Sequence, residues 1–307
     1  MPYHRHHGVA LMLAGLVVFG CSDSGSPPDV EGLTSVQITD TPFPYDVVEH
    51  ANLFIVQVEA GTDSGSGGSG CTNATVVATP NRTIDLLALQ GGTTATLGET
   101  KLSAGDYRAV CITINTDLSS LVLRDGRILT GTSSPVIDWS GSGTRIIKAD
   151  IFDSIPVTDS GGTILIHFDV GKSFIPLQDV FPPRTDSGYA FIAVTEALYP
   201  PHAGSISGTV VGTASGGTPI PHSSIRAMVG DSAMAENTWF VAGTGTTDTT
   251  GHFKIAYLAP SSRWAPQGWV YNLVVDAPST TSFLPVTTKG VTVVAPTETP
   301  LGEIVLP

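Results

Sequence analysis

The 307-residue chain has 14 basic and 27 acidic residues, which gives a formal net charge of −13 at pH 7. This charge repels nucleic-acid phosphates and anionic lipid headgroups, so it argues against nucleic-acid binding and against electrostatic membrane attachment. Glycine (34) and proline (22) are abundant, and hydrophobic residues make up 41% of the chain. This composition predicts an all-β protein with a hydrophobic core, and the length predicts two domains.

An apolar run of about Val9–Phe19 follows a start that carries Arg5 and three histidines. It is too short to cross a bilayer as a helix, which takes roughly 20 apolar residues, but it has the length of a secretory h-region. The stretch Leu16–Cys21 resembles the lipobox of bacterial lipoproteins, which implies cleavage before Cys21 and attachment of a diacylglycerol to its thiol. The alternative is an ordinary signal peptide with a chance cysteine.

The lipobox resemblance implies a location. Residues 1–20 would be the signal peptide, and their removal would leave a net charge of −14 because Arg5 is lost. Residues 21–32 would form a lipidated tether, since Ser22–Gly32 is polar and has no hydrophobic periodicity. We expect acyl chains such as palmitate to hold the protein in the bacterial cell envelope. Ser22 after Cys21 favours the outer membrane under the enteric sorting rule.

Short apolar runs separated by turn signals predict a first β-sandwich domain over residues 33–199. In the strand predicted at Leu53–Glu59, alternation places Phe54, Val56 and Val58 on one face. Further strands are predicted at Ser35–Thr39, Arg82–Leu89, Tyr107–Ile114, Leu118–Leu123, Arg127–Leu129, Thr163–Val170 and Tyr189–Ala197. In the strand at 163–170 the inward residues are Ile164, Ile166, Phe168 and Val170.

If Cys21 is lipidated, Cys71 and Cys111 remain as an even pair in an exported protein. The strand alternation turns Val110 and Ile112 toward the core and Cys111 away from it, where a loop cysteine could reach it. We therefore predict a Cys71–Cys111 disulfide, which would contribute roughly 4 kcal/mol in the chain-entropy model. The alternative is two free thiols.

Four motifs in the first domain follow the order of a known family. They are ITDTP at Ile38–Pro42, IDLL at Ile84–Leu87, LSAGDY at Leu102–Tyr107 and HFDVGKS at His167–Ser173. Together they resemble the bacterial lipoprotein family known as domain of unknown function 4382. Thr41, Ser103 and His167 depart from its alanine, proline and aspartate. The resemblance covers roughly residues 33–199 and implies a β-sandwich lipoprotein without an established activity.

A second pattern begins after two prolines and predicts a domain over residues 200–307. Its successive motifs are Ser205–Val211, Thr247–Phe253 and Leu301–Leu306. These resemble carboxypeptidase regulatory-like domains, which have a transthyretin-like sandwich of the carbohydrate-binding-like type. The resemblance implies a non-catalytic β-module, such as a stalk, a spacer or part of a carbohydrate-handling protein.

Three tryptophans of the second domain are candidate ligand-binding residues. Trp239, Trp264 and Trp269 lie near loops rich in serine, proline and glycine, where an aromatic side chain can form a platform for a sugar ring. The alternative is that these side chains pack in the core or at the rim of the sandwich. Aromatic area alone does not identify a ligand.

The sequence predicts no catalytic residue, metal site or cofactor. The histidines after position 21 lack metal-ligand spacing, and no nucleophile elbow occurs. His167 and Asp169 share a strand face and are compatible with a metal or a proton relay, but we expect a solvated face. Asp40 and Asp46 flank a proline-rich loop, where loop capping is favoured over calcium binding.

These observations predict a lipid-anchored, non-enzymatic protein of the cell envelope with a structural or binding function. Its partners would be the membrane, through the lipid, and a polysaccharide or an envelope protein. The alternative function is a polysaccharide-binding surface module that uses the second-domain tryptophans. A hydrolase would require a pocket that gathers His167, Asp169 and a further carboxylate.

Overall fold

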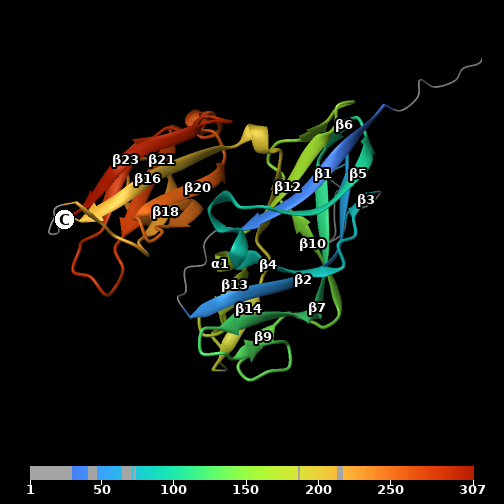
Figure 1. Cartoon of the computed structure of the whole chain (residues 1–307), viewed down its shortest axis with the longest axis horizontal. Helices are drawn as coiled ribbons and strands as arrows, with labels where there is room; N and C mark the ends of the chain where they lie inside the picture. The colour runs from blue at the N-terminus through green and yellow to red at the C-terminus, as the bar shows by residue number, and fades with distance from the viewer. Residues whose placement is uncertain (1–29, 41–46, 64–70, 72–73, 186, 213–216) are drawn as a thin grey trace, which may run out of the picture.

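The computed structural model describes residues 30–40, 47–63, 71, 74–185, 187–212 and 217–307. Its regular structure is almost entirely β-strand, in two β-sandwich domains in tandem, which confirms the predicted fold class (Figure 1). The N-terminal domain runs from β1 (Glu31–Asp40) to β15 (Thr195–Leu198), and the C-terminal domain from β16 (Gly204–Gly212) to β23 (Glu298–Leu306). The short helix η2 (Pro200–His202) joins them.

Some N-terminal predictions lie outside the described residues. They are the lipobox with Cys21, most of the tether, and Asp46. In the described part of the chain, no helix is long and apolar enough to cross a membrane. The lipid anchor and the two predicted domain boundaries stay predictions.

Two sheets enclose the core of the N-terminal domain (Figure 1). The first has the order β15-β12-β1-β5, with β12 at Gly162–Phe168 and β5 at Ala95–Ser103. The second has the order β10-β7-β2-β3, and β4 and β8 pair with β2 and β7. These strands are β2 (Val48–Gly61), β3 (Thr75–Ala78), β4 (Arg82–Asp85), β7 (Ala109–Leu123), β8 (Ile128–Leu129) and β10 (Thr144–Ala149).

Period-two alternation in β12 directs its large side chains into this core. Ile38 on β1 lies beside Ile166 on β12 in parallel register, and both are fully buried. Ile164, Phe168 and Val170 are also fully buried, so the predicted inward face is confirmed. Burial of one such side chain contributes about 1.5–3 kcal/mol.

In strand β2 the buried side chains differ from the predicted alternation. Leu53 and Ile55 are buried, whereas Phe54 and Val56 are only half-buried and Val58 is fully buried, so the prediction that Phe54, Val56 and Val58 share one face is wrong. The register against β7 shifts immediately after Ile55, and Val58 then returns to the buried side. A β-bulge adds a residue to one strand and thereby reverses the alternation beyond it.

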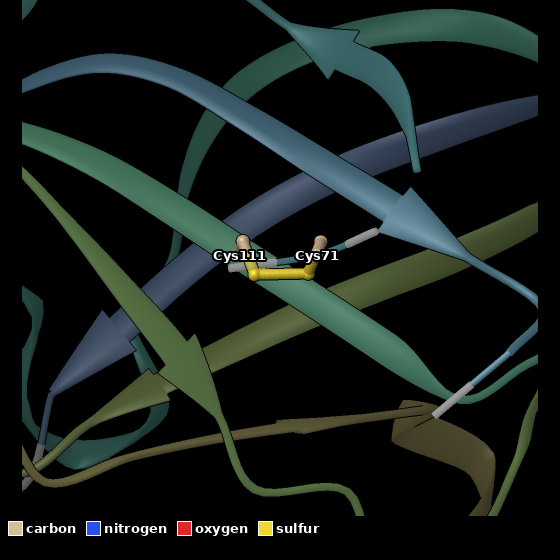
Figure 2. Close-up of a disulfide and its surroundings, with 2 residues drawn as sticks. All are labelled: Cys71 and Cys111. Atoms are coloured by element: carbon tan, nitrogen blue, oxygen red, sulfur yellow. A yellow bond between two sulfur atoms is a disulfide. The ribbon is translucent and has the colours of Figure 1, made fainter. Parts of the chain in front are cut away.

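The predicted disulfide joins Cys71 to Cys111, with the two Cα atoms 5.9 Å apart (Figure 2). Cys111 lies on β7 and is fully buried. Its neighbours Val110 and Ile112 belong to the hydrophobic core cluster, whereas Cys111 does not. The side chain therefore leaves β7 on the face opposite the core, as the alternation predicts.

Smaller elements complete the N-terminal domain. A two-stranded sheet pairs β11 with β6, and a three-stranded sheet has the order β13-β14-β9. These elements and the short helices are β6 (Gly105–Tyr107), β9 (Val136–Asp138), β11 (Ile155–Val157), β13 (Phe174–Pro176), β14 (Gly188–Phe191), η1 (Leu86–Gly92) and α1 (Val170–Ser173). Asp85 begins η1, and Asp169 begins α1 by accepting a hydrogen bond from the backbone N–H of Lys172.

Two four-stranded sheets enclose a separate core in the C-terminal domain. In one, β16 pairs with β17, β20 and β23; the other has the order β19-β18-β21-β22. The remaining elements are β17 (Thr218–Pro219), β18 (Ser224–Gly230), β19 (Phe240–Thr246), β20 (His252–Leu258), β21 (Val270–Asp276), β22 (Val286–Val291), η3 (Glu236–Thr238), η4 (Ser261–Arg263) and η5 (Ala265–Gln267). Phe253 and Tyr271 are the largest fully buried side chains in this core.

The motif at 247–253 forms the turn that leads into β20. The Asp248 carboxylate accepts hydrogen bonds from the backbone N–H groups of Thr250 (2.8 Å) and His252 (3.0 Å). Gly251 has φ +74°, and a Cβ there would lie 2.7 Å from the carbonyl oxygen of Val210. The aspartate and the glycine are therefore explained by turn geometry.

Candidate functional site

A cavity of about 220 Å³ lies between the two domains. The N-terminal domain contributes residues of β12, α1 and β15 and Phe152 to its wall, and the C-terminal domain contributes residues of β19, β20, β21 and the η4 region. Its ionisable side chains are His167, Asp169, Lys172, Glu196, Tyr257, Arg263 and Tyr271. A concave cavity that combines aromatic surface with convergent polar groups is the usual form of a small-ligand site.

The N-terminal wall is set by the pairing of β12 with β15. His167 and Glu196 are direct cross-strand partners, so their side chains leave the sheet on the same side. Asp169 follows two residues after His167, and its carboxylate lies 2.9 Å from the ammonium of Lys172. Lys172 Nζ also donates to the carbonyl oxygen of Val241 in the C-terminal domain, at 3.2 Å.

Burial favours the neutral forms of two groups of the N-terminal wall, His167 and Glu196. It lowers the pKa of His167 from 6.5 to about 4, although the charge of Asp169 acts in the opposite direction. It raises the pKa of Glu196 despite the opposing charges of Lys172 and Arg263. The expectation of a solvated strand face around His167 is therefore wrong, because the C-terminal domain covers that face.

The C-terminal wall is built around Tyr257, whose φ is +58°. A bulky residue rarely adopts this left-handed conformation, which costs of order 1–3 kcal/mol. The register of β20 against β16 is irregular in this region, between Gly204 and Ile206 of β16. Tyr257 donates its hydroxyl to the carbonyl oxygen of Gly92 in η1, at 3.2 Å, and its ring lies 6.4 Å from that of His167. A strained residue thus connects the two domains.

The three candidate tryptophans have different positions. Trp264 lines the cavity with Phe240, and their ring centroids are 5.3 Å apart. Trp269 is 38% exposed and lies 6.0 Å from Phe240, so it extends the same aromatic cluster to the surface. Trp239 is 6% exposed and donates its indole N–H to the carbonyl oxygen of Asp231 at 2.7 Å. Trp239 therefore packs as a core residue and lies outside this cluster.

Arg263 lies at the boundary between this cavity and a more open groove of about 560 Å³, since it lines both together with Phe152. Its guanidinium carbon is 3.9 Å from the centroid of the Phe152 ring and 5.2 Å from that of Trp264. The carboxylate of Asp153 is 4.0 Å away. The cation is thus held mainly against aromatic faces.

The remaining candidate, Asp40, has a structural role, and the described residues form no metal site. The Asp40 carboxylate is buried and accepts a hydrogen bond from the backbone N–H of Val170 at 3.1 Å, which is a capping contact. Among the described residues, no group of three or more His, Cys, Asp or Glu side chains could hold a metal ion. Thr195 lines the cavity, and its buried hydroxyl has no hydrogen-bond partner in the described part of the chain.

Sequence reasoning identified His167, Asp169 and Trp264 as candidates but missed Glu196, Arg263 and Tyr257. The cross-strand register that places Glu196 beside His167 pairs two residues that are 29 positions apart in the chain. The approach of Arg263 depends on how the two domains pack. In the sequence, this site was indicated by the polar pair His167 and Asp169 in an apolar strand and by Trp264 beside a loop.

The model of the family "Domain of unknown function (DUF4382)" matches residues 31–184, which is half of the chain. The match includes β12 and α1, and therefore His167, Asp169 and Lys172, and it ends before Glu196. A comparison with curated proteins finds no match.

Among solved structures, the chain is similar to a 9R-lipoxygenase from Cyanothece PCC8801, with 17% identity, a TM-score of 0.24, and coverage of 36% of this chain and 17% of the lipoxygenase. It is also similar to the shaft pilin SpaA from Lactobacillus rhamnosus GG, with 8% identity, a TM-score of 0.23, and coverage of 90% and 97%. The minor pilin GBS52 of Streptococcus agalactiae gives 11% identity, a TM-score of 0.21, and coverage of 89% and 95%. At these TM-scores the similarities carry no argument about function.

Proposed function

Because this chain belongs to the DUF4382 family, which is defined without a function, we propose its function from the site itself. The protein is a non-enzymatic protein of the cell envelope, and it binds a saccharide in the cavity between its two domains. The observation that carries the proposal is the combination of aromatic side chains and hydrogen-bonding groups in one cavity. The C–H bonds on the face of a sugar ring carry partial positive charge and pack against the electron-rich face of an aromatic ring. The hydroxyl groups of the sugar require the polar partners.

The size of the cavity limits the bound unit. At about 220 Å³ it is smaller than the roughly 300–1,000 Å³ typical of sites for drug-sized ligands, so we expect one or two sugar rings inside it. Trp269 and the open groove beyond Arg263 would contact the flanking part of a longer chain.

The test is a binding measurement on immobilised polysaccharides and on a glycan array. We expect Trp264→Ala and Phe240→Ala to lose binding by at least about tenfold, which corresponds to 1.4 kcal/mol. The matched control is Phe181→Ala, because Phe181 is 97% exposed and lies outside the cavity. Since Trp264 packs against the C-terminal core, Phe240→Ala separates loss of binding from loss of folding. Absence of binding to any saccharide would remove the proposal.

The proposal includes a lipid anchor at Cys21, in the outer membrane. The lipobox at Leu16–Cys21 supports it, and the net charge of −13 leaves acyl chains as the suitable means of attachment. Intact-mass analysis of detergent-extracted protein tests it directly. We expect the loss of residues 1–20 and the gain of acyl chains, and Cys21→Ser should release the protein from the membrane.

A second candidate function is hydrolysis of a saccharide, because the cavity gathers His167, Asp169 and a second carboxylate, Glu196. Burial keeps the Glu196 carboxyl protonated to higher pH, as a general acid requires. Asp169, however, is held by Lys172 and caps α1, which occupies the carboxylate that would act as base or nucleophile. Release of reducing ends from a bound polysaccharide, abolished in Glu196→Gln, would replace the binding proposal with this one.

A further inference from the structure

Arg263 is the cation of the cavity whose charge is least neutralised by the protein. Lys172 is paired with Asp169 at 2.9 Å and bonded to the Val241 carbonyl. For Arg263, the nearest carboxylate is that of Asp153, at 4.0 Å, and the Asp153 side chain is 67% exposed. Within the described residues, the guanidinium donates no hydrogen bond to another residue. Its N–H donors therefore remain available.

The aromatic neighbours of Arg263 hold it in place without using those donors. The guanidinium lies over the ring of Phe152 at 3.9 Å and near the ring of Trp264 at 5.2 Å. A planar cation stacked on a ring keeps its N–H groups directed outward in the plane, where they match the two oxygens of a carboxylate. Because these contacts favour one orientation of the Arg263 side chain, a ligand that binds there loses less conformational entropy.

Glu196, the other carboxyl group near Arg263 in the cavity, does not neutralise the charge of Arg263. No ion pair within 4.0 Å joins it to Arg263 in the described part of the chain. Burial favours the neutral form of its carboxyl group, so it offsets the charge of Arg263 less than an ordinary glutamate would. The cavity therefore combines aromatic faces and hydrogen-bonding groups with the Lys172–Asp169 ion pair and with Arg263, a cation whose charge is less neutralised by its neighbours.

From this arrangement we infer that the saccharide bound between the domains is an acidic one, and that Arg263 binds the carboxylate of a uronic-acid ring whose face packs against the aromatic cluster. This inference rests on the proposed saccharide-binding function and specifies its ligand class. The overall negative charge of the protein repels polyanions in general, so recognition of an acidic sugar requires such a local cation.

The experiment uses the full-length protein extracted in detergent, and oligomers of galacturonate, glucuronate and mannuronate. Each is paired with its counterpart in which the carboxylates are reduced to primary alcohols. Hydrogen bonds to charged groups contribute roughly 1.5–3 kcal/mol, so we expect the reduced counterpart of the preferred oligomer to bind about 10–100-fold more weakly. Arg263→Gln should weaken binding of the acidic oligomer to the same extent and so remove its preference over the reduced counterpart.

Arg263→Lys keeps the charge but lacks the planar pair of donors, and it should bind with intermediate affinity. Phe181→Ala serves as the matched surface control. Equal affinity for acidic and reduced oligomers, or an unchanged Arg263→Gln, would overturn the inference. If only neutral saccharides bind, and do so through Trp264 and Phe240, the inference fails while the proposed function stands. If no saccharide binds, both fail.

Discussion

His167 makes stability depend on pH. Burial lowers its folded-state pKa to about 4, whereas in the unfolded chain it has its ordinary value of 6.5. Between these values the unfolded chain takes up a proton that the folded chain does not, so the free energy of unfolding falls as the pH falls from 6.5 to 4. We expect a loss of about 1–3 kcal/mol over this window, measured by urea denaturation. In His167→Gln the loss should be smaller.

His50 provides a control of opposite sign. Its hydrogen bond to Asp85, 2.7 Å long, raises its pKa, so its contribution is complete below pH 6.5 and disappears as the pH rises through the raised value. His50 is exposed, and its effect should be small. His50→Gln should therefore not reduce the acid-side loss; if it does, or if His167→Gln leaves that loss unchanged, the assignment to His167 is wrong.

Gly251 should tolerate no side chain. Its φ of +74° disfavours any L-residue, and an added Cβ would lie 2.7 Å from the Val210 carbonyl oxygen. We expect Gly251→Ala to lower the free energy of unfolding by about 2–4 kcal/mol. Gly126 has φ +84° with nothing within 4 Å of its added Cβ, so Gly126→Ala should cost only about 1 kcal/mol. Equal losses in both variants would show that the close contact does not matter.

At the scale of elements, the disulfide ties the segment before β3 to the central strand β7. The loop between Cys71 and Cys111 contains β3, β4, η1, β5 and β6, so the bond restricts a large part of the unfolded N-terminal domain. The double variant Cys71→Ser, Cys111→Ser should lower the free energy of unfolding of this domain by roughly 4 kcal/mol. A denaturation curve followed through Trp139, which is buried in this domain, measures the change. An unchanged midpoint would contradict this expectation.

The elements also show how far the sequence could predict this fold. Alternation along Thr163–Val170 identified the buried face because β12 runs without a bulge. The same reasoning failed at Phe54 and Val56, since a bulge reverses the alternation in β2 and nothing local in the sequence marks it. The disulfide could be predicted from the even number of cysteines left after Cys21 and from the side-chain alternation around Cys111. Only parts of the site could be predicted, because its N-terminal wall (residues 152–196) and its C-terminal wall (residues 240–271) come from distant parts of the chain.

At the scale of the whole molecule, Tyr257 connects two domains that have separate cores. Its hydroxyl donates to the Gly92 carbonyl in η1, and its ring lies beside His167. Its left-handed backbone strains the C-terminal domain by about 1–3 kcal/mol, and the contact with the other domain offsets this cost. Glycine adopts this conformation without strain. Tyr257→Gly should therefore remove the connection while relieving the backbone.

We expect Tyr257→Gly to loosen the arrangement of the domains without unfolding either core. Small-angle scattering should report a larger radius of gyration, and limited proteolysis should cleave faster near η2 (Pro200–His202). Tyr257→Phe is the matched variant, because it keeps the ring and removes only the hydrogen bond to Gly92, for a loss of about 1 kcal/mol. If Tyr257→Gly keeps the compact scattering profile, the remaining contacts of Lys172 and Arg263 suffice to hold the domains together.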